Sequence, residues 1–170
     1  CECAELVNFE GEQVDGVYTP EGIISSTSIR DALLNGHIED ANRWLGYNYA
    51  VSGKIVEGRK IGRSLGFPTA NIEPADVFKL VPSDGVYAVE VILDSRSFNG
   101  MLSIGFNPTV NKYKGKRSIE VHIFDFDMDL YGHTITTIFR FRLRDERRFE
   151  NTEQLAEQMK IDKETALRLL

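Results

Sequence analysis

The chain has 170 residues, which is enough for one domain with a short appendage and enough to bury a core without disulfides or a metal. Its 20 basic and 26 acidic side chains give a formal net charge of -6. Because an acidic surface repels phosphate backbones, this balance argues against a general nucleic-acid coat protein, although one basic cluster could still hold a small phosphorylated ligand.

Signals for export, membrane insertion and structural zinc are missing from the sequence. No apolar run approaches the roughly 18 residues of a membrane helix and no signal peptide is present, so a cytoplasmic protein without a membrane partner is expected. Cys1 and Cys3 are separated by one residue, closer than zinc ligands usually stand, and no second pair follows. Because the chain starts with Cys rather than Met, we expect it to be a fragment of a longer protein.

The first part of the chain predicts turns and then two helices. Residues 1–24 carry few periodic signals and several turn dipeptides. Ser28 with Asp31 has the spacing of a capping box for the first helix, which is predicted to stop at Asn35-Gly36. The second helix fits Ile38 to Leu45.

From Tyr47 onward the apolar residues alternate, which predicts strands. Turns rich in Gly and Pro separate them, so we expect an antiparallel sheet or a small barrel. In the last strand, Phe141 and Leu143 are predicted to share the face of Ile135 and Phe139. The predicted strands cover residues 49–56, 85–93, 98–104, 118–124 and 134–143.

The C-terminal part predicts a helical tail. Asn151 or Thr152 can cap a helix whose apolar stripe includes Met159. Asp162 is predicted to begin a last short helix that runs to Leu170.

A glycine-rich basic segment, residues 58–71, follows the first strand. Gly58, Gly62 and Gly66 allow the backbone to approach a ligand, and Arg63 adds positive charge nearby. The composition is that of a phosphate-binding loop, although it matches neither the Walker nor the dinucleotide motif. A flexible basic hairpin loop explains the same composition equally well.

The end of this segment, Pro68-Thr69-Ala70-Asn71, offers a hydroxyl and an amide oxygen. In an extended backbone Thr69 and Asn71 point to the same side. Both are hard oxygen ligands of the kind that Mg²⁺ prefers. The alternative is a polar turn whose side chains cap local backbone groups.

The same segment resembles the signature of riboflavin kinases, and further motifs of that family follow in order over roughly residues 47–165. The resemblance implies a mainly β fold, a six-stranded antiparallel Greek-key barrel with a C-terminal helix and an N-terminal helical segment. The further motifs are Pro82-x-x-Gly85-Val86-Tyr87, Ser103-Ile104-Gly105-x-x-Pro108-Thr109, Glu120-x-His122-Ile123-Phe124-Asp125, Leu130-Tyr131-Gly132 and Leu143-Arg144-x-Glu146-x-x-Phe149.

The resemblance implies transfer of the ATP γ-phosphoryl group to the riboflavin 5′-hydroxyl, giving FMN and ADP. Such transfer depends on positioning and charge neutralisation, so a metal, a phosphate cradle and a base are expected. Glu120 matches the catalytic base, with His122 as a suggested contact, although a Glu in an alternating strand usually faces solvent. Thr69 and Asn71 match the ligands of Mg²⁺ and of the ATP phosphates.

The remaining implied roles concern ATP and the flavin. The loop that holds Gly58, Gly62 and Arg63 is expected to cover the phosphates, and Tyr131 to lie near the adenine. An aromatic ring and planar guanidinium groups suit an isoalloxazine, although the same arginines could form a solvated basic edge. The implied flavin-binding residues are Arg144, Arg147 and Phe149.

The upstream part is similar to the end of the FAD synthetase module of bifunctional bacterial enzymes, through Ile24 to Arg30 and Gly36-x-Ile38-Glu39-x-Ala41-Asn42. Residues 1–46 are therefore expected to be a remnant of that adenylyltransferase module, and residues 47–170 the kinase. The His-x-Gly-His motif of such modules is absent, so FAD synthesis by this chain is not expected. We expect a monomer, fused to such a module in the full-length protein.

Two other functions compete with the kinase. A non-catalytic module could keep the flavin and nucleotide site, although Thr69, Asn71 and Glu120 together argue against it. A small oligonucleotide-binding barrel would need a broad basic groove, which the net charge disfavours. Asn107 stands where many relatives have Arg, so its role is left open, as is that of the basic loop 111–117.

Overall fold

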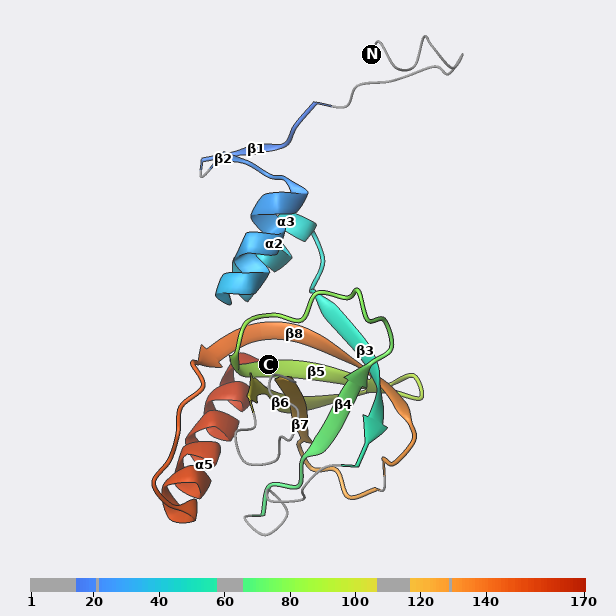
Figure 1. Ribbon diagram of the computed structural model, residues 1–170, viewed down its shortest axis with the longest axis vertical. Coiled ribbons are helices and arrows are strands. Elements are labelled where there is room, and N and C mark those ends of the chain that lie inside the picture. The colour runs from blue at the N-terminus through green and yellow to red at the C-terminus, as the bar shows by residue number, and fades with distance from the viewer. Residues whose placement is uncertain (1–14, 21, 58–65, 107–116, 129) are drawn as a thin grey trace.

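A computed structural model describes residues 15–20, 22–57, 66–106, 117–128 and 130–170. Six of its strands close a barrel, two short helices lie at one end of it, and a long C-terminal helix lies along its side (Figure 1). The elements are β1 (Tyr18–Thr19), β2 (Gly22–Ile23), α2 (Ser26–Asn35), α3 (Ile38–Leu45), β3 (Ala50–Val56), β4 (Ala70–Pro74), β5 (Gly85–Leu93), β6 (Arg96–Phe106), β7 (Arg117–Ile123), β8 (Thr134–Arg144) and α5 (Thr152–Leu169).

Around the barrel the strands follow the order β3-β4-β7-β6-β5-β8, and every neighbouring pair is antiparallel. Strands β5, β6 and β7 are consecutive neighbours and β8 returns to pair with β5, which is a Greek-key arrangement. The expected six-stranded barrel is confirmed. Of the six barrel strands the sequence pattern missed β4, because Ile72 is its single buried residue and five residues show too little alternation.

Alternation along the strands separates an interior from an outer face. Ile119, Val121 and Ile123 of β7 belong to the main core inside the barrel, together with fully buried Tyr87 and Leu102. The side chains between them on β7 point outward, as the sequence predicts. This outer face is where the polar residues of the site stand.

The predicted face of Phe141 and Leu143 is wrong. Phe139 and Phe141 pair with consecutive residues of β5, so Arg140 is the extra residue of a β-bulge. A bulge turns the following residues to the other face. Ile135 and Phe139 therefore lie in the barrel core, whereas Phe141 and Leu143 pack in the outer cluster beneath α5.

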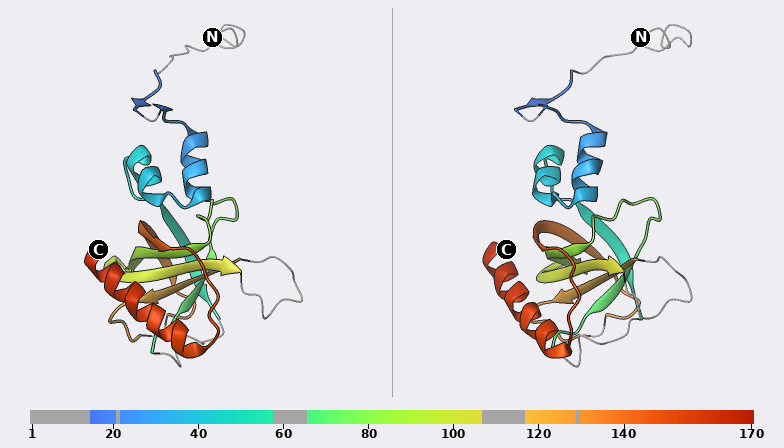
Figure 2. Two further views of the ribbon diagram at one scale, coloured as in Figure 1. Left: turned by 90° about the vertical axis from the view of Figure 1, so that its left-hand side faces the viewer. Right: turned by 60° about the vertical axis from the view of Figure 1, so that its left-hand side comes forward.

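The two short helices cover one end of the barrel (Figure 2). Leu33 of α2 and Ile38 of α3 belong to the same core cluster as the barrel interior. The capping box of α2 is formed by Ser25 and Ser28, not by Ser28 with Asp31 as predicted, because the Ser25 hydroxyl accepts from the Ser28 backbone N–H at 3.1 Å. The predicted bounds of α3 are confirmed.

The C-terminal helix is continuous, so the prediction of a separate helix from Asp162 is wrong. Asn151 caps α5 by accepting from the Gln154 backbone N–H at 2.9 Å. The Asp162 carboxylate is buried and bonds to a side chain of the barrel instead of capping backbone groups. The helix packs on β5, β6 and β8, where Ala166 is fully buried.

Candidate active site

Three of the predicted site residues meet on the outer face of β4 and β7. Asn71 pairs with Glu120, and Glu120 pairs with Ser103, so these side chains form a row across β4, β7 and β6. Paired Cα atoms in antiparallel strands are about 4.5–5.5 Å apart. Thr69 immediately precedes β4, and its hydroxyl donates to Glu120 Oε2 at 3.2 Å. A hydroxyl, an amide and a carboxylate are thus brought together, each partly exposed.

The side-chain oxygen atoms of these three residues fit a magnesium ion. Thr69 and Asn71 supply neutral oxygen atoms beside the single carboxylate of Glu120. Among the described residues no group of three or more His, Cys, Asp or Glu side chains could hold a metal by itself. Mg²⁺ commonly takes only one or two protein ligands and completes its shell with water and substrate phosphates. The residues therefore suit an ion that completes its coordination shell with water or with a phosphate group.

His122, the suggested contact of Glu120, bonds to the backbone that leads into β4. Its Nδ1 lies 2.8 Å from the Pro68 carbonyl oxygen, so this nitrogen carries the proton and donates. Its ring packs edge-on between Phe67 and Phe124, with centroids 5.4 and 5.6 Å away. Burial is the main cause that lowers the pKa of His122, so the neutral ring is favoured. The hydrogen bond fixes the backbone directly before Thr69.

The residues expected to bind ATP are described only in part. Gly58, Gly62 and Arg63 lie outside the described residues. Tyr131 is 44% exposed. The next residue, Gly132, donates its backbone N–H to the Ile55 carbonyl at 3.2 Å, which joins this turn to the end of β3. Tyr131 therefore lies at the end of the barrel from which the glycine-rich segment continues.

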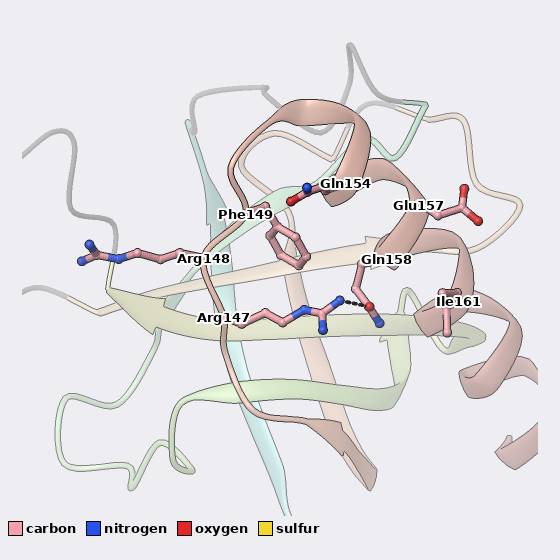
Figure 3. A pocket seen from close by; sticks show the side chains of 7 residues that line it. All are labelled: Arg147, Arg148, Phe149, Gln154, Glu157, Gln158 and Ile161. Atoms are coloured by element: carbon pink, nitrogen blue, oxygen red, sulfur yellow. Dashed lines mark hydrogen bonds between the residues drawn. The ribbon is translucent and has the colours of Figure 1, made fainter.

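A pocket of about 430 Å³ lies between α5 and the segment that leads into it (Figure 3). Phe149 and Ile161 give it an apolar part, while Arg147 and Gln158 contribute polar groups. The Arg147 guanidinium lies 4.9 Å from the centroid of the Phe149 ring. Two of the three residues expected to contact a flavin therefore line one pocket.

Arg144, the third expected flavin residue, is not among the pocket-lining residues. Its Nε donates to Asp162 at 3.0 and 3.1 Å, and its Nη2 donates to Asp162 Oδ2 at 2.8 Å. Its guanidinium also lies 5.7 Å from the centroid of the Phe149 ring. Arg144 therefore holds the wall of the pocket to α5. The sequence analysis predicts Asp162 as a helix start and not as an ion-pair partner. A carboxylate in line with Met159 and Ala166 on an apolar helix face is the signal of a buried ion pair.

The pocket and the polar row are connected across the outer face of β6. A Cβ atom at Gly105 would collide with the Glu146 carboxylate, so Glu146 lies directly against β6. Gly105 and Ser103 point outward from the same strand, and Ser103 pairs with Glu120. The segment from Glu146 to Phe149 thus begins against Gly105, the next outward position of β6 after Ser103, and ends at the pocket.

The family model of riboflavin kinase, Flavokinase, matches residues 45–170. The bifunctional riboflavin kinase/FMN adenylyltransferase of Bacillus subtilis is 42% identical over 146 residues, which are 85% of this chain and 46% of that protein. The protein of the same name from Escherichia coli K12 is 40% identical over 144 residues, or 84% of this chain and 45% of that protein. The chain therefore spans about half the length of the curated relatives that it matches.

Solved structures agree on the fold. A macrolide-efflux protein from Streptococcus pneumoniae superposes with a TM-score of 0.85 at 36% identity, over 95% of this chain and 53% of that chain. Riboflavin kinase from Trypanosoma brucei superposes with a TM-score of 0.50 at 22% identity, over 71% of this chain and 78% of that chain, which supports the fold alone. In the part of the chain that the structure describes, no helix is long and apolar enough to cross a membrane. The family model matches most of the chain, and the family motifs that the structure describes lie on the barrel. The chain therefore belongs to the riboflavin kinase family.

Proposed function

We propose that this chain transfers the γ-phosphoryl group of ATP to the 5′-hydroxyl of riboflavin, giving FMN and ADP. The observation that carries the proposal is the contact of Thr69 with Glu120 at 3.2 Å, beside Asn71 in the adjoining strand. Phosphoryl transfer asks a protein mainly for positioning, charge neutralisation and a base at the attacking hydroxyl. A carboxylate beside neutral oxygen ligands supplies two of these functions in one place.

In this proposal Glu120 is the catalytic base. Its carboxylate accepts the proton of the riboflavin 5′-hydroxyl as that oxygen attacks the γ-phosphorus atom, and the bond to the ADP leaving oxygen breaks. Thr69 and Asn71 hold Mg²⁺, which neutralises charge on the ATP phosphates when it is bound. The hydrogen bond from His122 to Pro68 keeps Thr69 next to Glu120.

The flavin ring is assigned to the pocket beside α5. Phe149 and Ile161 offer apolar contact to the isoalloxazine, and Arg147 offers a planar cation. The Arg144 guanidinium also lies 5.7 Å from the centroid of the Phe149 ring. The segment from Glu146 to Phe149 connects this pocket to the row that contains Glu120, so the ribityl chain is expected to follow it toward the base.

The nucleotide is assigned to the end of the barrel where β3 stops. Tyr131 is proposed to lie beside the adenine, and Gly58, Gly62 and Arg63 to bind the phosphates. We further propose that residues 1–46 derive from the end of an FAD synthetase module and that residues 47–170 form the kinase. The match to the Bacillus subtilis protein covers 85% of the chain and so extends upstream of the family-model match, which supports this division. A cytoplasmic location and a monomeric state stay predictions.

The test is FMN production from riboflavin with ATP and Mg²⁺, followed by separation of FMN from riboflavin. Turnover by the parent chain that is abolished in Glu120→Gln supports the kinase. Glu164→Gln, an exposed carboxylate on α5, is the matched control and should retain the parent rate. Tight riboflavin binding without FMN production in the parent chain would favour the non-catalytic flavin-binding module.

A further inference from the structure

Asp162 is a buried carboxylate outside the catalytic row. Its side chain is only 5% exposed, although it stands in the middle of a helix that faces solvent on its other side. Burying a carboxylate is costly unless hydrogen bonds and an opposite charge compensate it. Arg144 and Gln158 provide this compensation, and Gln158 donates to Asp162 Oδ1 at 2.7 Å.

Arg144 and Gln158, the two partners of Asp162, both contact residues that line the flavin pocket. Arg144 faces the Phe149 ring, and its Nη1 donates to the Asp145 carbonyl at 2.9 Å, at the start of the segment that forms the pocket wall. The carbonyl oxygen of the Gln158 side chain accepts from Arg147, whose guanidinium lies 4.9 Å from the centroid of the same Phe149 ring (Figure 3). The Asp162 carboxylate therefore holds Arg144 directly and Arg147 through Gln158, and both arginines contact Phe149.

We infer that Asp162 is a positioning residue for riboflavin, which sets the geometry of Phe149 and Arg147 through Arg144 and Gln158. This inference rests on the proposed kinase function and on the assignment of the flavin to this pocket. Asp162 itself is not among the residues that line the pocket, so it acts through its partners. Because Asn71 and Glu120 stand on β4 and β7, and Thr69 immediately precedes β4, a change at Asp162 should affect riboflavin more than Mg-ATP.

Asp162→Asn is the sharpest substitution because it keeps the shape of the side chain. Arg144 now donates three hydrogen bonds to two carboxylate oxygens, and an amide replaces one of these oxygens with an NH₂ group. Donor then faces donor, and the Arg144 charge loses its counter-ion. The guanidinium is expected to turn away and to release both Phe149 and the Asp145 carbonyl.

The experiment measures riboflavin affinity directly, by the change in flavin fluorescence on titration of the protein, and compares KM values in the FMN assay. We expect Asp162→Asn to weaken riboflavin binding by about tenfold, the effect of losing one charge-assisted contact. The KM for Mg-ATP and kcat should stay within about twofold, as expected when ground-state binding of one substrate is removed. Glu164→Gln controls for loss of a carboxylate on the same helix. Gln158→Met, which releases Arg147 while leaving the Arg144–Asp162 pair intact, should also weaken riboflavin binding.

Four outcomes bear on the two proposals. No FMN from the parent chain overturns the kinase function. An active parent whose Asp162→Asn variant binds riboflavin normally overturns the positioning role, as does an equal rise in both KM values. Should Asp162→Asn fail to fold, Gln158→Met decides, and unchanged riboflavin affinity in that variant also overturns the inference.

Discussion

The Thr69 hydroxyl lies 3.2 Å from Glu120 Oε2, although 50 residues separate the two in the sequence. The barrel register brings them together, because Asn71 of β4 pairs with Glu120 of β7. Neither residue is fully buried, so substrates can reach both. In the proposed kinase reaction, with Thr69 as metal ligand and Glu120 as base, this contact would place the charge of the ATP phosphates next to the proton acceptor.

Glu120→Gln should remove the base while keeping the hydrogen bond from Thr69. We expect kcat to fall by about 10²–10⁴, the usual contribution of general base catalysis, while riboflavin affinity stays close to that of the parent. Rates and fluorescence titrations measure the two quantities separately. A variant that keeps more than about a tenth of the parent kcat would falsify the assignment of the base.

Asn71→Leu should alter the magnesium dependence of the reaction. Leu has a similar volume but no oxygen ligand, so the Mg²⁺ concentration for half-maximal rate is expected to rise by about tenfold. Rates at fixed ATP over a Mg²⁺ series give this value. Asn99→Leu, on the exposed surface of β6, is the matched control. An unchanged magnesium dependence in Asn71→Leu argues that this residue is not a ligand.

His122 should make stability depend on pH. Burial lowers the pKa of His122 from its ordinary value of 6.5, so below that value the unfolded chain takes up a proton before the folded protein does. The stability that the neutral His122 ring contributes is fully present above about pH 6.5, the pKa of a histidine in the unfolded chain. This contribution is lost as the pH falls from there toward the lower pKa of the folded state. The unfolding temperature of the parent should therefore fall more between pH 7.5 and 5.5 than that of His122→Asn, which keeps a donor for Pro68.

The control for this experiment is His133→Asn, because the His133 side chain is 48% exposed. Its unfolding temperature should follow that of the parent across the pH series. A parallel pH dependence of the parent and His122→Asn contradicts the prediction.

Gly105→Ala should disturb the segment that joins the two halves of the site. The added methyl group meets only the Glu146 carboxylate, the end of an exposed and flexible side chain, so this carboxylate should move off β6 at a cost within about 0.5 kcal/mol. Urea unfolding measures this small change, and riboflavin binding should weaken because the segment that begins at Glu146 is displaced. In Glu146→Ala the carboxylate is already absent, so adding Gly105→Ala to that variant should not weaken riboflavin binding further. A further loss of riboflavin affinity in the double variant would contradict the prediction.

Much of the barrel could be predicted because its strands alternate between a core and a polar face. The outward position of Glu120 is predicted from its apolar neighbours Ile119 and Val121. The burial of both neighbours confirms it. The bulge at Arg140 could not be predicted, because the apolar spacing of Phe139 and Phe141 is the same with or without it. Side-chain identity gives the period of a strand but not an insertion in its pairing.

The candidate site could be predicted as a set of residues but not as a set of contacts. Thr69 and Asn71 were expected on one side of an extended segment, and they stand beside Glu120. Arg144 was expected at the flavin, whereas its guanidinium is bonded to Asp162. The position of α5 decides which arginine can bind a ligand and which one pairs with a carboxylate. The local pattern of the sequence says little about this tertiary position.

The helical pair should stabilise the kinase barrel although it precedes the proposed domain boundary at residue 46. Asn42 of α3 donates to the Phe139 carbonyl of β8 at 2.9 Å and accepts from the Tyr49 backbone N–H at 2.7 Å. These contacts lie at the edge of the main core, which includes Leu33 and Ile38 of the two helices. Asn42→Ala leaves a donor and an acceptor of the barrel unsatisfied, so we expect a loss of about 1–3 kcal/mol in the free energy of unfolding.

Asn35→Ala is the matched control for Asn42→Ala, because the exposed Asn35 side chain bonds to the Asp31 carbonyl of its own helix, at 2.8 Å, and not to the barrel strands that the structure describes. Its effect should stay within about 0.5 kcal/mol. Urea unfolding followed by two probes, tryptophan fluorescence from Trp44 of α3 and far-ultraviolet circular dichroism, tests whether helices and barrel unfold together. Coincident transitions that shift to lower urea in Asn42→Ala mean that the helices are part of the kinase fold. Separate transitions, with the circular dichroism midpoint unchanged by Asn42→Ala, would mean instead that the barrel is stable without them.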